Sequence, residues 1–466
     1  MARRCCRLKN ILICMCTPCC CLTFLYIYAA LTISLQMNSM LPKVSSNLAS
    51  PHFKALGSFR NYTGPSVPKT FWENHQESDA LWNQLQRSVD HLFNPLLHPG
   101  KSNTLLERSS LDESLLQQSY NEVTAMDRVM DTFEKLPKQI REFARYMQRR
   151  DYPVLLHPDG ECGAQSKQEK EPPLILFAIK STVLNFKNRH AIRQTWGRIG
   201  WVEGWRINGS EGEVGGACIR RVFLFGRETP EELGMDVSHL LRAESKRHGD
   251  ILQWDFHDTF FNLTLKDVLF WSWFSHRCTQ PLFVFKGDDD VFVNTPKLIT
   301  FLKHQLKQHQ TRGTMDEFMV GDVIGSATPN RVKRSKYFIP EGFYRGRYPV
   351  YAGGGGVVYS GGLARRLHNI SKTIHLFPID DVYVGMCMIR LNAHPVHDPA
   401  FLTFDFTEKG EAEPCSYHSI LLVHKRSPTE VVELWADIRN TREQCQDVPL
   451  RADKRKTLKT TPPPSA

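Results

Sequence analysis

Three consecutive aspartates in the segment LFVFKGDDDVFVN, residues 282–294, are the residues best suited to chemistry. In an extended segment alternate side chains share a face, so Asp288 and Asp290 should point one way and Asp289 the other. Two carboxylates at the end of a strand suit Mg²⁺ or Mn²⁺, which take few protein ligands and complete their shell with phosphate and water. The pattern predicts a divalent-cation site that holds a diphosphate. The alternative is a capped turn with solvated aspartates, which the apolar flanks disfavour.

A second acidic pair, Asp380 and Asp381, lies between apolar residues in HLFPIDDVYVGMC. A carboxylate in such a place can act as a general base that deprotonates an attacking hydroxyl. The same pair would also suit the acidic first turn of a helix that follows Pro378, and the two interpretations are compatible.

Four glycines lie between tyrosines in YAGGGGVVYSGG, residues 351–362. The run is not a Walker phosphate loop, because no G-K-[ST] follows it. Tyr348, Tyr351 and Tyr359 around the glycines favour a backbone that approaches a sugar closely between aromatic walls, over a flexible linker.

The segment FKGDDDVFVN resembles the D-x-D segment of the β-1,3-glycosyltransferases of the Golgi. Four further stretches are similar in kind: NRHAIRQTWG, GDILQWDFHDTFFNLTLK, YPVYAGGGGVVYSG and FPIDDVYVGMC. The likeness covers roughly residues 71 to 445. It implies an α/β chain with the GT-A fold, a Rossmann-like, mostly parallel sheet with flanking helices that binds a UDP-sugar and a manganese ion.

The resemblance also implies roles for individual residues. Asp381 would be the catalytic base, and the metal ligands would be Asp290 and His424. The nucleotide would contact Lys180, Ser181, Arg189, Arg193, Asp288 and Asp289. The sugars would contact Tyr351, Gly354, Gly355, Gly356 and Asp380. Without the resemblance, His424 is typical of a strand end and Arg193 of a solvated helix.

The Lys-Gly before the aspartates and the PIDDV motif look like the β-1,3-N-acetylglucosaminyltransferase branch. This branch implies transfer of GlcNAc from UDP-GlcNAc to the 3-hydroxyl of a terminal galactose, extending poly-N-acetyllactosamine on a glycoprotein or glycolipid, with Mn²⁺ or Mg²⁺. One alternative is a β-1,3-galactosyltransferase. Another is an inactive relative that acts as a lectin or chaperone, although such a protein should lose Asp288, Asp290 or Asp381. As partners, both a second copy of the chain in a homo-oligomer and other Golgi glycosyltransferases in a complex are compatible with this interpretation.

The elements that would position these residues alternate along the chain. Apolar runs predict strands at 174–181, 221–226, 250–256 and 282–285, and helices at 188–197, 229–249, 263–274 and 297–309. Such alternation favours a mostly parallel sheet covered on both faces. We expect a helical collar over 71–172, the catalytic domain over 173–446 and a disordered tail over 447–466.

The N-terminal region predicts a membrane anchor. Residues 11–42 carry no charge and four basic residues precede them, so 1–10 should be a cytosolic tail and 11–35 a single transmembrane span. A stem over 36–70 would then connect to a lumenal body, giving a type II protein of the Golgi membrane. The alternative is a cleaved signal peptide, whose apolar core usually has only about 7–15 residues.

Cysteines and glycosylation sequons agree with a lumenal body. Seven of the 13 cysteines lie in or beside the span, where they suit palmitoylation or a lipid-facing helix equally. The other six contain no C-x-x-C pair, so zinc is not expected, and they could form up to three disulfides, with Cys387 and Cys415 as one candidate pair. The sequons lie at Asn61, Asn208, Asn262 and Asn369.

The distribution of charge excludes one class of partner. The chain has a formal net charge of +10, of which each end carries +4, so only +2 remains for the body. A body so nearly neutral argues against a nucleic-acid-binding face.

Overall fold

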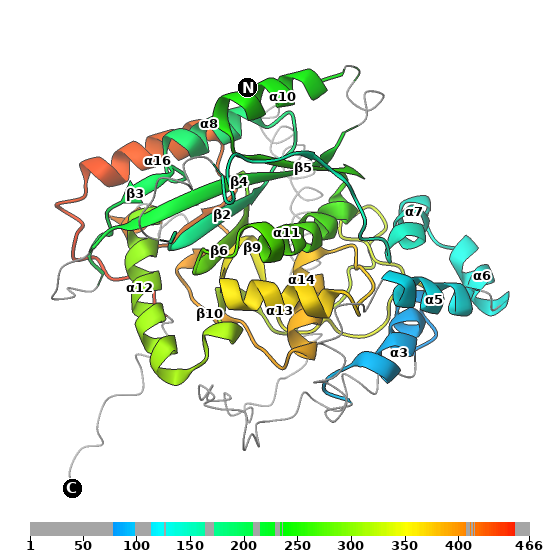
Figure 1. Ribbon diagram of the computed structural model, residues 1–466. Coiled ribbons are helices and arrows are strands. Elements are labelled where there is room, and N and C mark those ends of the chain that lie inside the picture. The colour runs from blue at the N-terminus through cyan, green and yellow to red at the C-terminus, as the bar shows by residue number, and fades with distance from the viewer. Residues whose placement is uncertain are drawn as a thin grey trace, which may run out of the picture. The chain divides into compact units, whose positions relative to one another are not determined.

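The structure is a computed structural model, and it describes residues 78–97, 113–124, 127–163, 172–207, 215–228, 234, 236–406, 411, 413 and 415–452 (Figure 1). The predicted cytosolic tail, span and stem, with Asn61, lie outside these residues, as does Asn208. Within the described ranges, no helix is both long and apolar enough to cross a membrane.

A nine-stranded sheet forms the centre of the described chain, with strands in the order β1-β5-β4-β2-β6-β9-β8-β10 and β3 added beside β4. Its strands are β1 (Val154–Leu156), β2 (Ile175–Lys180), β3 (Gly200–Val202), β4 (Ala217–Arg227), β5 (Ile251–His257), β6 (Phe283–Asp288), β8 (Met319–Ile324), β9 (Tyr351–Ser360) and β10 (Val396–His397). A second sheet holds β11 (Phe401–Leu402), β12 (Leu422–His424) and β7 (Val291–Val293).

The prediction of a mostly parallel sheet is wrong, because the sheet is mixed. Strands β5, β4, β2 and β6 are parallel, as the alternation of strands and helices predicted. Strand β9, however, runs antiparallel to both β6 and β8. This strand is the tyrosine-flanked glycine run, whose glycines gave no signal for a strand.

Two hydrophobic clusters cover the two faces of the sheet, and the strands divide their side chains between them with a period of two. In β2, Leu176 and Ala178 belong to one cluster, whereas Ile175, Phe177 and Ile179 belong to the other. By the same alternation, Val284 of β6 lies on the first face and Phe285 on the second. Lys180 and Lys286, at even positions, therefore lie on the first face.

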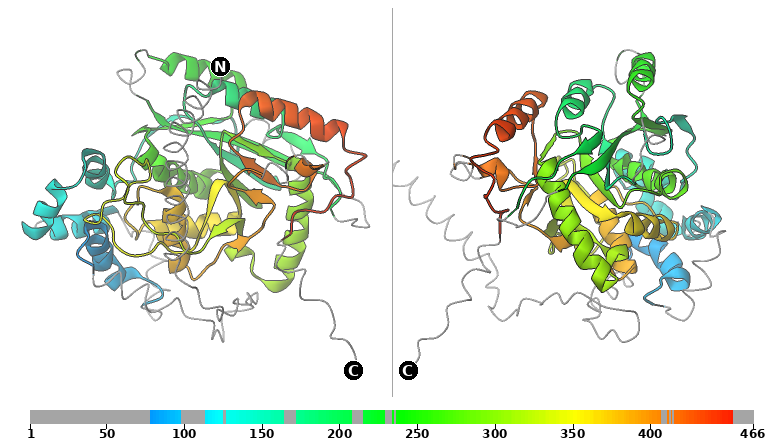
Figure 2. Two further views of the ribbon diagram at one scale, coloured as in Figure 1. Left: turned by 180° about the vertical axis from the view of Figure 1, so that it is seen from behind. Right: turned by 60° about the vertical axis from the view of Figure 1, so that its left-hand side comes forward.

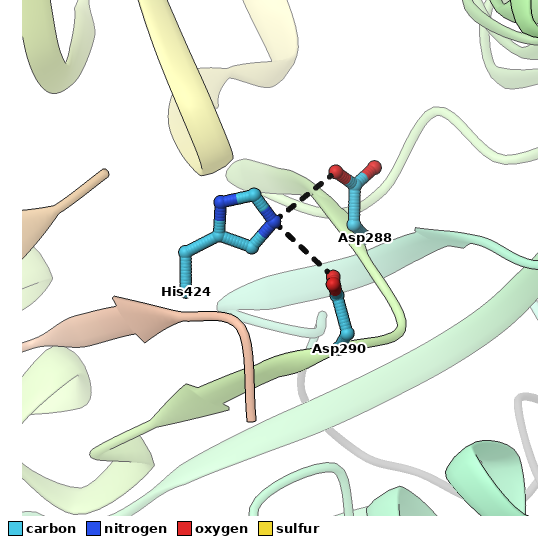
Figure 3. A group of neighbouring side chains, drawn as sticks. All are labelled: Asp288, Asp290 and His424. Carbon is cyan, nitrogen blue, oxygen red and sulfur yellow. Dashed lines mark ion pairs between the residues drawn. The ribbon is translucent and has the colours of Figure 1, made fainter. Parts of the chain in front are cut away.

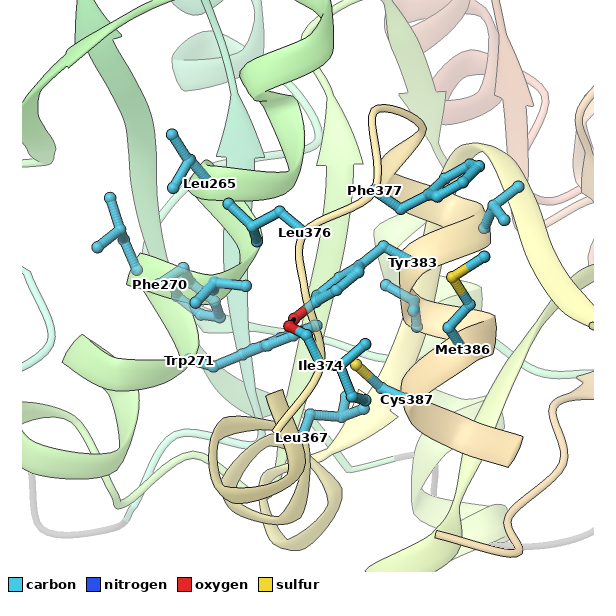
Figure 4. Packing of buried hydrophobic residues seen from close by; sticks show 14 of the residues in the cluster. Leu265, Phe270, Trp271, Leu367, Ile374, Leu376, Phe377, Tyr383, Met386 and Cys387 are labelled. Carbon is cyan, nitrogen blue, oxygen red and sulfur yellow. Dashed lines mark hydrogen bonds between the residues drawn. The ribbon is translucent and has the colours of Figure 1, made fainter. Parts of the chain in front are cut away.

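Helices cover both faces (Figures 1 and 2). The first face carries α11 (Leu263–Arg277), α13 (Gly361–Ser371) and α14 (Asp380–Arg390), which pack on one another around Trp271, Leu367 and Tyr383 (Figure 4). The helices α8 (Phe186–Gln194), α12 (Thr295–Arg312) and α16 (Pro428–Asn440) contribute to the second cluster, and α10 (Ser238–His248) precedes β5. The helix predicted from Thr229 is shorter than expected: Asp236 and Val237 are not helical and α10 begins at Ser238, while Thr229 itself lies outside the described residues.

In the part of the chain that the structure describes, four helices precede the sheet: α3 (Leu81–Phe93), α5 (Glu113–Thr124), α6 (Asp127–Glu134) and α7 (Lys138–Tyr146). Helix α3 packs on α14 and on the segment that leads into it. Trp82 Nε1 donates to Leu376 O at 3.0 Å, and Asp90 makes a two-point ion pair with the buried Arg390 of α14 at 2.6 and 2.8 Å. The predicted collar region is not purely helical, because β1 joins the edge of the sheet beside β5.

Two further predictions differ from the structure. Among the described residues the disulfides are Cys162–Cys278 and Cys415–Cys445, so the suggested Cys387–Cys415 pair is wrong, and Cys387 is buried within α14. The predicted tail also begins too early at 447. Val448 O accepts from Lys297 Nζ at 2.8 Å, and Arg451 N donates to Ser419 O at 2.8 Å, so these residues pack on the body.

Candidate active site

Asp288, Asp290 and His424 converge at the carboxyl end of β6 (Figure 3). One ligand atom of each residue lies within 4.8 Å of the other two. His424 Nε2 is 3.3 Å from Asp290 Oδ1 and 3.9 Å from Asp288 Oδ2. The histidine is brought there by β12, which pairs antiparallel with β7 and sets His424 opposite Val291. Residues more than 130 positions apart in the sequence thus form one cluster.

The cluster can accept a cation from solution. The side chains of Asp288 and Asp290 are 39% and 44% exposed, and that of His424 is 18% exposed. Burial opposes charge on Asp290, but the hydrogen bond from His424 outweighs it and lowers the pKa of this carboxyl. Two carboxylate oxygens and one imidazole nitrogen form a donor set that fits Mn²⁺ and accommodates Mg²⁺.

Asp289 points away from this cluster, as the alternation of side chains predicted. Its carboxylate accepts from Ser181 Oγ at 2.6 Å and from Asn185 Nδ2 at 3.1 and 3.2 Å. Burial raises the pKa of Asp289 to about 6 despite these bonds. Asn188 Nδ2 also donates to Asp289 O at 3.1 Å, so this aspartate anchors the turn that carries its two neighbours.

The second acidic pair begins α14 and faces two lysines. Lys180, the last residue of β2, is ion-paired with Asp380. Lys286 Nζ, on the neighbouring strand β6, lies 3.2 Å from Asp381 Oδ1 and 3.5 Å from Asp380 Oδ2. Behind the lysines, Asp267 of α11 accepts from Lys286 at 2.9 Å and lies 3.8 Å from Lys180.

The two carboxyls of the pair differ in their environment. Burial opposes charge on Asp380, but Lys180 and Lys286 outweigh it and hold the pKa of Asp380 well below its usual range. Burial, together with the charge of Asp380, raises the pKa of Asp381. The side chain of Asp381 is also the more exposed, at 21% against 12%. Asp381 is therefore the carboxylate that can take a proton from a bound molecule near neutral pH.

The glycines of β9 make room for these groups. A Cβ at Gly355 would lie 2.8 Å from ring carbons of His424, and one at Gly356 would lie 2.6 Å from the Phe285 ring. Gly354 has φ +91°, and a Cβ there would collide with Thr403. Gly354 and Gly356 line the cavity of the site, whereas Gly355 packs on the ring of His424.

A cavity of about 630 Å³ contains both acidic groups. Its walls include most of the predicted residues: Lys180, Ser181, Asp288, Asp289, Asp290, Tyr348, Tyr351, Gly354, Gly356, Asp380, Asp381 and His424. Tyr359 lies elsewhere, buried, with its hydroxyl accepting from Trp271 Nε1 at 3.1 Å.

Arg189 and Arg193 do not line this cavity. Arg189 is buried, pairs with Glu244 at 2.7 Å and donates to Ser181 Oγ at 3.0 Å and to Thr182 O. Arg193 bridges Glu244 at 2.6 Å and Asp250 at 2.8 Å. Both guanidiniums thus hold α8 and α10 against the end of the sheet.

Sequence reasoning missed the roles of Lys286 and Asp267. A signal for Lys286 was present, since a lysine inside the apolar run LFVFKG needs a buried anionic partner. Because side chains alternate between the two faces of a sheet, Lys286 should lie on the same face as Lys180 of the neighbouring strand. Asp267 gave a weaker signal, as one acid within the apolar helix LTLKDVLFWSWF.

Two predicted glycosylation sites are described. Asn369 is exposed on α13. Asn262 precedes α11 and its amide donates to His257 O at 2.8 Å.

The sequence is similar to known glycosyltransferases. A family model described as Galactosyltransferase matches residues 187–399. The mouse protein named N-acetyllactosaminide beta-1,3-N-acetylglucosaminyltransferase 2 is 40% identical over 383 residues, covering 82% of this chain and 90% of that protein. Its human namesake is 39% identical, covering 81% and 89%. The bovine UDP-GlcNAc:betaGal beta-1,3-N-acetylglucosaminyltransferase 9 is 42% identical, covering 63% and 73%.

Proposed function

The chain belongs to the galactosyltransferase family, in which it is similar to β-1,3-N-acetylglucosaminyltransferases, and we propose that it transfers GlcNAc from UDP-GlcNAc to the 3-hydroxyl of a terminal galactose. The acceptor would be an N-acetyllactosamine chain on a glycoprotein or glycolipid. The observation that carries this proposal is the presence, in one cavity, of an Asp-Asp-His cluster and a separate carboxylate of raised pKa.

The Asp-Asp-His cluster and Asp381 have different roles in an inverting transfer. The galactose 3-hydroxyl oxygen attacks C1 of the GlcNAc unit, and the bond from C1 to the diphosphate oxygen breaks, so that UDP leaves with the electron pair. Asp381 accepts the proton of the hydroxyl as the new bond forms. Because attack and departure occur on opposite faces of the sugar, the configuration at C1 inverts.

The lysines and Asp380 serve this step by keeping Asp381 in position. Lys286 contacts both acids, and Lys180 neutralises Asp380. Asp380, already ion-paired, is free to accept a hydrogen bond from the acceptor but is a poor base, because its pKa is lowered. Asp381 is then the one of the two that can exchange a proton at neutral pH.

Asp288, Asp290 and His424 would hold Mn²⁺ or Mg²⁺. The ion would neutralise the charge that develops on the departing diphosphate. The four parallel strands, of which β6 ends at Asp288 of this cluster, support assignment of the GT-A fold.

The charge pattern of the N-terminus supports a location in the Golgi membrane, with a type II anchor at 11–35 and a lumenal body. Two disulfides among the described residues agree with an oxidising compartment. Immunofluorescence with protease protection of the full-length protein would test both location and orientation.

Donor screening tests the proposed activity. The full-length protein would be incubated with an N-acetyllactosamine acceptor and either UDP-GlcNAc or UDP-galactose, with Mn²⁺ or with EDTA. We expect a GlcNAc product that EDTA abolishes. Turnover of UDP-galactose alone would support the galactosyltransferase alternative, and glycan binding without turnover of either donor would support a lectin.

A further inference from the structure

Arg426 lies two residues beyond His424 and has no part in the transfer chemistry described above. Its side chain is only 4% exposed, although it carries a charge of the same sign as the cation that the Asp-Asp-His cluster would bind. Like charges repel, so a guanidinium at this place should weaken the site unless its bonds outweigh the repulsion. Those bonds connect the cluster to two other segments of the chain.

The backbone of Arg426 fixes two of the cluster's ligands relative to each other. Strand β12 pairs with β7 as far as His424, which lies opposite Val291. The chain then turns at Lys425, which has φ +61°, and Arg426 N donates to Asp290 O at 2.7 Å. This bond continues the pairing past the end of β12. It therefore helps to set the 3.3 Å between the His424 imidazole and the Asp290 carboxylate (Figure 3).

The side chain of Arg426 is held by three further segments of backbone and side chain. Its Nη1 donates to Asp405 Oδ2 at 2.9 Å, and its Nη2 donates to the other oxygen of the same carboxylate. Nη2 also donates to the Tyr417 hydroxyl at 3.2 Å. Nη1 folds back onto the carbonyl oxygens of His424 and Lys425, at 3.3 and 3.2 Å. Because two-point arginine–carboxylate pairs combine charge with fixed geometry, the guanidinium holds the turn that follows His424.

The two side-chain partners of this guanidinium are anchored in turn. Asp405 comes two residues after Thr403, which lines the active-site cavity and whose Oγ1 donates to Gly353 O at 3.2 Å. The ring of Tyr417 packs edge-on against Phe292 of β7, with 6.1 Å between the ring centroids. The guanidinium thus joins the cavity wall and β7 to the segment that carries the histidine.

We infer that Arg426 is a positioning residue for the Asp-Asp-His cluster, which holds His424 where it and Asp290 can bind the same divalent cation. The inference rests on the proposed function and specifies how its cation site is maintained. Loss of a group that orients metal ligands typically weakens metal binding about 10–100-fold. The sign of the effect separates positioning from charge, because removal of a positive charge would by itself strengthen the binding of a cation.

Mn²⁺ binding tests the inference without sugar transfer. Mn²⁺ alone would be titrated into the full-length protein, and the free ion would be counted by electron paramagnetic resonance. We expect Arg426→Met to raise the Kd for Mn²⁺ about 10-fold, and Arg426→Lys, which keeps the charge but loses the two-point geometry, to raise it about 3-fold. Asp405→Asn should also raise the Kd about 3-fold, and adding it to Arg426→Met should cause no further loss, because the same bonds are already broken.

Two controls separate positioning from general stability. Arg193→Met removes another buried guanidinium that bridges two acids, and it should lower the Tm but leave the Kd for Mn²⁺ unchanged. His424→Ala removes the ligand that Arg426 positions, so Arg426→Met should change the Kd less than about twofold in this background. The side chain of Asp405 is 50% exposed, so Asp405→Asn carries the test if Arg426→Met does not fold.

The outcomes distinguish this inference from the proposed function. An unchanged Kd for Mn²⁺ in folded Arg426→Met, or in Asp405→Asn where the first variant does not fold, would overturn the inference. Equal weakening in Arg193→Met, or a wild type that binds no Mn²⁺, would also overturn it. Arg426-dependent Mn²⁺ binding without GlcNAc transfer would contradict only the proposed function, whereas Mn²⁺-dependent transfer with Arg426-independent binding would contradict only the role of Arg426.

Discussion

The two acidic pairs of the active site differ in how their charge is balanced. Asp380 and Asp381 face Lys180 and Lys286, with Asp267 behind the lysines, so the chain itself supplies the positive charge. Asp288 and Asp290 have only His424 at ion-pair distance among the described residues, and they are more exposed. A carboxylate pair that the chain leaves open to solvent can hold an external cation. A pair that is already neutralised is suited to positioning and proton transfer.

The largest expected loss of activity is at Asp381, in the acidic pair whose charge Lys180 and Lys286 neutralise. Asp381→Asn should lower kcat by about 10²–10⁴-fold, because the base is lost. Titration with UDP should show unchanged binding. Asparagine is nearly isosteric, so an equal loss of UDP affinity would point to a binding role for Asp381.

The pH profile of the wild type sharpens this prediction. The pKa of Asp381 is raised to about 7, and only its deprotonated form can accept a proton, so kcat should rise as the pH increases through about 7. Asp380→Asn removes a negative charge that raises this pKa, so the rise should move to lower pH. A rise that stays at the same pH in this variant would contradict the coupling between the two acids.

Substitution in the solvent-exposed pair, Asp288 and Asp290, should cause the next largest loss of activity. Asp290→Asn should lower kcat by about 10²–10³-fold and raise the Mn²⁺ concentration that gives half-maximal activity. Asp289→Asn is the matched control, because its side chain bonds Ser181 and Asn185 instead. This control should lower the Tm without changing the Mn²⁺ requirement, and an equal change in both variants would contradict the division of roles.

Removing Lys286 tests whether the buried carboxylates around it, Asp267 above all, depend on the positive charge of this lysine. Lys286→Met should destabilise the protein by about 3 kcal/mol, because it leaves Asp267 buried without its nearest cation. Adding Asp267→Asn should restore part of this loss, with a coupling energy of about 0.5–3 kcal/mol in thermal or urea unfolding. Strictly additive losses would show that the two side chains do not depend on each other.

The smallest effect on activity is expected at Arg193. Arg193→Met should lower the free energy of unfolding by about 1–3 kcal/mol, because it breaks bonds to Glu244 and Asp250. The KM for UDP-GlcNAc should stay within about twofold of wild type. A markedly raised KM would instead support the nucleotide contact that the family resemblance implied.

Local patterns predicted those features that depend on neighbouring residues. Alternation along DDD predicted that Asp289 would point away from Asp288 and Asp290, and apolar runs predicted the four parallel strands. The antiparallel strand β9 was missed because its glycines carry no strand propensity. Glycine is required in β9 because a Cβ there would collide with side chains that are distant in the sequence, such as His424 and Thr403.

By itself, the sequence determined the polar groups of the site and the strands and helices that carry most of them, because hydrophobic period and side-chain chemistry are local properties. Only the tertiary structure decided which charges meet. It placed Lys286 between Asp267, Asp380 and Asp381, enclosed Arg193 in ion pairs away from the cavity, and joined the end of the N-terminal helices to the segment before Asp380. These outcomes depend on strand order and helix packing, which bring together residues hundreds of positions apart and which no local pattern specifies.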